Sequence, residues 1–141
     1  MTDYTTPTAE YFDTPELGPE YYDLEFSYDR PPVTANQRLH WRRKADLTAG
    51  IRTTTRYLAR RIPELGRCEV TLTWYVTDNR RRDADNVVPT LKAMCDGLVD
   101  AGVVADDVPS LMKKNMPVIS RGDNSGLILR VARILPEAVA A

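Results

Sequence analysis

The amino-acid sequence predicts a small α/β or α+β domain in which a mixed β-sheet carries two main helices on one face. Three observations predict this class: some stretches alternate apolar and polar residues, others repeat apolar residues at helical spacing, and the two kinds alternate along the chain. With 141 residues, 43% of them apolar and 28% charged, the chain can bury one core. We expect a cytoplasmic protein, because no stretch resembles a signal peptide or a membrane span. Cys68 and Cys95 fit no disulfide or zinc pattern and are predicted to be buried thiols.

The first half of the chain is predicted to form a strand, a loop and a helix. Residues 21–28 alternate aromatic and aliphatic residues with polar ones, as a half-buried strand does. Residues 29–44 open with two prolines and stay polar, which predicts a loop. Residues 45–62 are predicted to be a helix that ends before Pro63, because one face gathers the apolar residues Leu47, Ile51, Leu58 and Ile62.

The second half is predicted to add a strand, a second helix and shorter strands. Residues 68–76, "CEVTLTWYV", alternate most regularly and form the clearest strand. A helix should run from about Pro89 to Ala101, because proline suits a first helical turn and Gly102 suits a helix end. We expect residues 103–107, "VVADD", to be a short strand-like segment. The apolar stretches on either side of residues 121–126, "RGDNSG", are expected to pair as a hairpin.

Charge is distributed unevenly along the chain. Residues 1–25 hold seven acids and no Lys or Arg, which leaves 13 of the 20 acids against all 19 bases in the remainder. Residues 1–20 lack apolar periodicity and are predicted to be an acidic, disordered tail, followed by one domain over residues 21–141. A basic body fits a polyanionic partner, for which the tail could act as an electrostatic competitor. A tail that serves solubility alone is an equal alternative.

The most densely charged stretch is "RRRDADN", residues 80–86. If the backbone is extended there, Asp83 and Asp85 project to the same side and repel each other unless a cation lies between them. One or two carboxylates with waters and substrate phosphate are the usual ligands of Mg²⁺. Asp106 and Asp107 also follow a strand-like segment, and strand ends of one sheet often meet at one edge, so these acids could converge. A surface patch of salt bridges is the alternative.

Between the two acidic pairs, Lys92 and Asp96 lie four residues apart on one face of the predicted helix, where an ordinary salt bridge would also place them. Taken together, these spaced residues resemble the RusA family of Holliday junction resolvases, many of them encoded by phages and prophages. In that family an Arg-Asp-x-Asp-Asn run precedes a helix with Lys and Asp, and an Asp-Asp pair follows. The resemblance covers residues 80–108, and "RPPVTAN" (30–36) and "HW" (40–41) are loosely similar to the family's entry loop.

The resemblance implies a Mg²⁺-dependent endonuclease, with Mn²⁺ as an alternative ion, that cleaves four-way DNA junctions in recombination and repair. Asp83, Asp85 and Asp107 match the family's metal-binding and catalytic acids, and Asp106 matches a companion acid that could also bind metal. Lys92 matches the essential lysine. Two symmetric nicks need two active sites related by a dyad, so the resemblance also implies a homodimer.

DNA contact is expected from the bases of the motif and from the loop before the first helix. Besides Lys92, the expected contact residues are Arg80, Arg81, Arg82, Asn36, Arg38, His40, Arg43 and Lys44. His40 could equally be structural. Lys92 follows Asp85 by seven residues where the family has four, so "VVP" (87–89) is an insertion. It lies either in a loop before the helix, with Lys92 in the first turn, or in the helix, where it shifts Lys92 by about one turn.

Two other functions remain open from the sequence. The chain could be a metal-dependent nuclease that acts mainly on forks, flaps or other branched DNA. It could also be a protein that binds junctions without cutting them, although a pure binder would gain by losing acids near phosphate.

Overall fold

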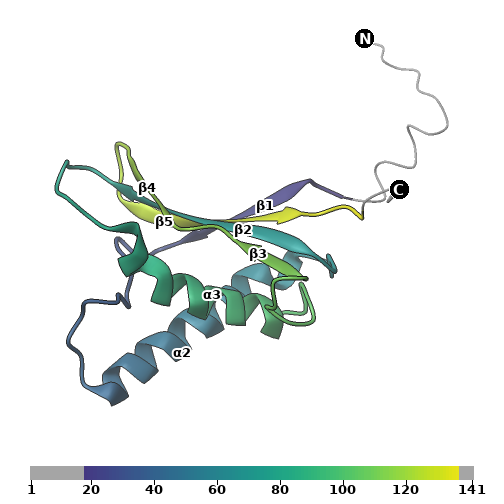
Figure 1. Cartoon of the computed structure of the whole chain (residues 1–141), viewed down its shortest axis with the longest axis horizontal. Coiled ribbons are helices and arrows are strands. Elements are labelled where there is room, and N and C mark those ends of the chain that lie inside the picture. Colours follow the sequence, from purple (N-terminus) through teal and green to yellow (C-terminus); the bar gives the residue numbers. More distant parts are fainter. Residues whose placement is uncertain (1–17, 137–141) are drawn as a thin grey trace, which may run out of the picture.

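In the computed structural model, which describes residues 18–136, two helices cover one face of a five-stranded mixed sheet (Figure 1). This is the expected arrangement of sheet and helices. The strands are β1 (Tyr21–Phe26), β2 (Cys68–Val76), β3 (Met112–Lys114), β4 (Val118–Arg121) and β5 (Gly126–Arg133). The helices are α2 (Trp41–Leu58) and α3 (Val88–Asp100), with the short 3₁₀ turns η2 (Ala59–Arg61) and η3 (Ala84–Val87) beside them.

The sheet is arranged around β2 and β5. β5 lies between β1 and β2 and is antiparallel to both, with Leu129 opposite Leu24 on one side and Leu72 on the other. On its other side β2 pairs in parallel, first with β3 and then with β4. β2, α3 and β3 therefore form one crossover unit, which parallel strands require. The edge shared by β3 and β4 is the one that carries the candidate site.

The core lies between the sheet and the two helices. Leu24, Leu72 and Leu129 are buried because alternate strand residues point to the helical face, where they meet Ile51 of α2 and Met94 of α3. Cys68 and Cys95 belong to the same core as free, buried cysteines, as predicted. Burial raises the pKa of the Cys68 thiol to about 11 and that of Cys95 to about 12.

Three predicted elements differ from the structure. The first helix begins at Trp41 rather than at residue 45, because the His40 side chain accepts the Arg42 N–H and caps it. The hairpin is wrong, since β4 pairs in parallel with β2 and the turn at residues 122–125 leads around the end of β2 to β5. The segment 103–107 is not a strand.

The end of α3 explains why residues 103–107 do not form a strand. Gly102 has a φ of +83°, and the N–H groups of Gly102 and Val103 donate to the carbonyls of Val99 and Leu98. The left-handed conformation of Gly102 ends the helix and turns the chain so that Val103 and Val104 are buried against the end of α3. Their apolar character therefore reflects burial in a turn rather than strand pairing. Along residues 18–136, no helix has the length and apolarity needed to cross a membrane.

Candidate functional site

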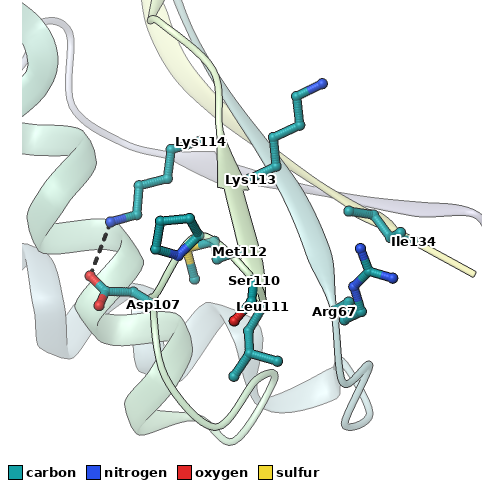
Figure 2. A pocket seen from close by; sticks show the side chains of 9 residues that line it. Arg67, Asp107, Ser110, Leu111, Met112, Lys113, Lys114 and Ile134 are labelled. Atoms are coloured by element: carbon teal, nitrogen blue, oxygen red, sulfur yellow. Dashed lines mark hydrogen bonds and ion pairs between the residues drawn. The ribbon is translucent and has the colours of Figure 1, made fainter. Parts of the chain in front are cut away.

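A cluster of two lysines and two aspartates joins α3 to the β3 edge of the sheet. The Lys92 ammonium donates to Oδ1 of Asp96 at 2.8 Å and to Oδ2 of Asp107 at 3.0 Å. Lys114 of β3 donates to the same Asp107 oxygen at 3.1 Å (Figure 2). Lys92 and Asp96 meet because they stand one turn apart on α3. We call these four residues the Lys–Asp cluster.

The ion pairs of the cluster shift the pKa of two of its members. Hydrogen bonds from Lys92 and then Lys114 lower the pKa of Asp107 to about 2. Hydrogen bonds to Asp96 and then Asp107 raise the pKa of Lys92. Both groups therefore stay charged through the neutral range. Asp106 belongs to the turn rather than to the cluster, because its Oδ1 accepts the Asp107 N–H at 2.8 Å and so fixes the backbone there.

Lys92 lies in the second turn of α3, not in the first. α3 begins at Val88 and continues directly from η3, so residues 84–100 are helical without an intervening loop. Residues 87–89, which the resemblance would make an insertion, are part of the helical segment, and this is the second of the two placements considered from the sequence. Lys92 nonetheless points to the acidic pair 106–107, because the shift of about one turn keeps it on the same side.

Asp83 and Asp85 lie at the start of this helical segment. Asp83 precedes η3 with an extended backbone, at φ −104° and ψ 130°, but Asp85 is inside η3. The expectation that both project alternately from an extended strand is therefore wrong for Asp85. Both residues are exposed, and the recorded ion-pair contact of Asp83 is a distant one, at 3.9 Å from Nε of Arg81.

The acids were expected to converge on a metal ion. Among residues 18–136, no group of three or more His, Cys, Asp or Glu side chains is arranged to hold one. The acids form two separate pairs, and Asp107 already accepts from two ammonium groups. A preformed set of three carboxylates does not fit this structure. The donor chemistry of exposed Asp83 and Asp85 fits the other mode, in which Mg²⁺ takes one or two carboxylates and completes its shell with water and substrate phosphate.

The three arginines of the motif have different surroundings. Arg82 is only 14% exposed, lies over the Trp74 ring and donates to Asp78 at 2.7 Å. This hydrogen bond lowers the pKa of Asp78. Arg80 and Arg81 are 80% and 92% exposed. Arg82 therefore holds the loop in place, whereas Arg80 and Arg81 face the surroundings.

Hydrogen bonds tie the proline-rich loop to the motif, although the two are far apart in sequence. The Ala35 N–H donates to the carbonyl of Asn86 at 3.1 Å. The Thr90 hydroxyl donates to the carbonyl of Val33 at 2.7 Å and accepts the Val33 N–H at 3.2 Å. The loop thereby brings Asn36 toward the start of the helical segment, which contains Asp85 and follows Asp83.

The remaining expected contact residues lie on this loop and at the start of α2. Arg38, Arg43 and Lys44 are exposed, and none has an ion pair within the described part of the chain. Arg43 lines a groove of about 630 Å³ whose other walls include Arg30 and Trp74. His40 has the structural role described above, as the cap of α2.

Lys114 is the site residue that the sequence did not reveal. The three-residue strand β3 was not predicted, because "LMKKN" has no alternation long enough to indicate a strand. Only the pairing with β2 places Lys114 within reach of Asp107. Scans of the chain against protein-family models and against curated proteins found no match.

Proposed function

We propose that this protein is a metal-dependent, structure-specific DNA endonuclease of the RusA type that resolves four-way junctions in the cytoplasm as a homodimer. The single observation that carries the proposal is the Lys–Asp cluster. Lys92 lies 2.8 Å from Asp96 and 3.0 Å from Asp107, so two separate parts of the motif meet at one sheet edge.

The chain's own residues suit a phosphodiester substrate. Arg80 and Arg81 are exposed, with Arg81 3.9 Å from Asp83 and Arg80 3.5 Å from Asp78, so they can hold backbone phosphates near the acids. Lys92 offers a charge-assisted donor to a phosphate oxygen as negative charge develops on it. Mg²⁺ or Mn²⁺ held by Asp83 and Asp85 would neutralise the acids and supply hydroxide at neutral pH.

The homodimer part of the proposal follows from symmetry. A four-way junction is resolved by two nicks of opposite strands, and one domain offers one candidate site. A homodimer would supply the second site through a dyad.

The proposal is tested by Asp85→Asn, which removes one charge and keeps the shape of the side chain. Nicking of a synthetic four-way junction in Mg²⁺ should fall by orders of magnitude, because a metal ligand is weakened. Affinity for the junction in chelator should equal or exceed that of wild type, since a carboxylate that faces phosphate without a cation repels it. Both are measured on one protein sample, with linear duplex as the control substrate. Normal nicking by Asp85→Asn would remove Asp85 from the site.

One observation favours a second function, junction binding without cleavage. Asp107 is neutralised by two lysines, and the described residues form no three-acid group. Wild-type protein that binds the junction but leaves it uncut in both Mg²⁺ and Mn²⁺ would decide for this function.

A further inference from the structure

A hollow of about 500 Å³ lies beside the Lys–Asp cluster, at the beginning of β3 (Figure 2). Its walls come from β3, from the loop before β3, and from Arg67 and Ile134, which flank β2 and β5. Its charged lining residues are Asp107, Lys114, Lys113 and Arg67. Three cations therefore share the hollow with one carboxylate.

The carboxylate in the hollow does not balance these cations. Asp107 is already shared by Lys92 and Lys114, so it adds no unmatched negative charge. Lys113 is 65% exposed and approaches Glu69 only to 3.7 Å, on the side away from Asp107 (Figure 2). The Arg67 side chain is exposed and has neither an ion pair nor a hydrogen bond with another described residue.

Fold stability does not account for Arg67 and Lys113. Exposed, loosely paired side chains contribute little to folding, and they keep their rotamer freedom. β3 is also an edge strand, so its outer backbone groups are unpaired within the sheet. Side-chain cations next to free backbone N–H groups are the combination that proteins use to hold DNA phosphates.

We propose that this hollow binds the phosphodiester backbone of DNA, with Arg67 and Lys113 as its contacts, next to the candidate site at Asp107. The inference rests on the proposed function in one respect, that the polyanion is DNA. It extends the contact surface from Arg80 and Arg81, which follow the end of β2, to Arg67, which directly precedes β2. A strand bound along this edge would pass the Lys–Asp cluster.

The test uses Arg67→Ala, Lys113→Ala and the double variant of the full chain. Affinity for a labelled four-way junction is measured in chelator from about 50 to 200 mM NaCl. Each lost phosphate contact should flatten the log–log salt slope by about 0.9, which corresponds to roughly eightfold weaker binding near 0.1 M salt. Arg56→Ala is the matched control, because it removes one exposed arginine from the last turn of α2, which does not line the hollow. Its slope should stay close to that of wild type.

Thermal melts of each variant show whether the fold is kept, and Arg67→Gln with Lys113→Gln repeats the test with polar side chains should an alanine variant unfold. A wild-type slope in the double variant, or a change no larger than that of Arg56→Ala, overturns the inference.

Junction nicking by wild-type protein in Mg²⁺ separates this inference from the proposed function. If wild-type protein nicks the junction and the variants keep the wild-type salt slope, the proposed function is supported and the hollow is rejected as a DNA contact. If the variants have flatter salt slopes but wild-type protein does not nick the junction, the hollow is supported as a DNA contact and the nuclease function is rejected.

Discussion

The basic residues in the first turn of α2 are expected to lower the stability of the fold and to raise its affinity for DNA. Arg43→Glu should therefore raise the stability and lower the affinity. The turn contains Arg42, Arg43 and Lys44 and no acid. The amino end of a helix carries about half a positive charge, so each base there is unfavourable by roughly 0.3–1 kcal/mol at low salt. These bases are exposed and add nothing to the core, which is the pattern expected of residues kept for an anionic partner.

The magnitude follows from the position of Arg43. With His40 as the N-cap, Arg43 is the third helical residue, where a glutamate can also accept the N–H of the capping residue. Removing an unfavourable base and adding a favourable acid should together stabilise the fold by about 1 kcal/mol. For a domain of this size that raises Tm by roughly 3–5 °C. At 1 M salt, where the screening length is about 3 Å, most of the gain should disappear.

The assay pairs thermal melts with junction binding. Arg43→Glu should have a higher Tm than wild type but bind the junction more weakly. Its log–log salt slope should be flatter by about 0.9, as expected for one lost phosphate contact. Arg56→Glu is the control of opposite sign, because Arg56 stands in the last turn of α2, where a base is favourable. It should lower Tm and affect binding less. An Arg43→Glu variant that melts lower at low salt, or binds as wild type does, would show that Arg43 serves the fold and not DNA.

Three further substitutions test the packing of the helices and the charge of the site. Gly97→Ala should destabilise by about 1–3 kcal/mol in urea denaturation, because a Cβ there would lie 2.6 Å from a backbone oxygen of α2. Gly50→Ala, with open space around it, should instead stabilise by up to about 1 kcal/mol. The lowered pKa of Asp107 predicts stability that is complete above about pH 4 and lost as the pH falls toward 2, by roughly 1–2 kcal/mol after solvent screening. Asp107→Asn should lack this part of the pH dependence, and an identical acid profile in the variant would contradict the ion pairs.

The sequence predicted those parts of the fold in which local pattern and burial agree. β2 and α3 were placed within one residue, because the strand alternates and the helix has proline at its start and Gly102 after its end. The first four residues of α2 were missed, because an exposed basic turn held by a histidine cap carries no apolar period. β3 and the pairing of β4 depend on partners far away in the chain, which no local pattern contains.

The candidate site was predictable to a similar extent. Lys92 and Asp96 were predicted to lie on one face of the helix, four residues apart, and they form an ion pair. The contact of Lys92 with Asp107 was not predicted, because residues 103–107 form a turn and not the end of a strand. The alternating placement of Asp83 and Asp85 failed because a 3₁₀ turn begins between them. Arg82 could not be distinguished from its neighbours by composition, since its burial, its contact with Trp74 and its hydrogen bond to Asp78 all depend on the fold.

The charges of the site suggest where DNA affinity must originate. The Lys–Asp cluster holds two lysines and two aspartates, so it is neutral as a unit and attracts phosphate weakly by itself. Attraction must then come from cations outside it, and the exposed ones at this edge lie before and after β2, a strand of nine residues or roughly 30 Å. Arg80 and Arg81 stand at one end and Arg67 at the other, with the cluster between them. A nuclease with this distribution would bind a DNA strand through the cations at the two ends of β2, and the neutral cluster between them would face the phosphate that is cleaved. Removing cations at either end should therefore weaken the affinity for DNA more than it slows the cleavage of DNA that is already bound.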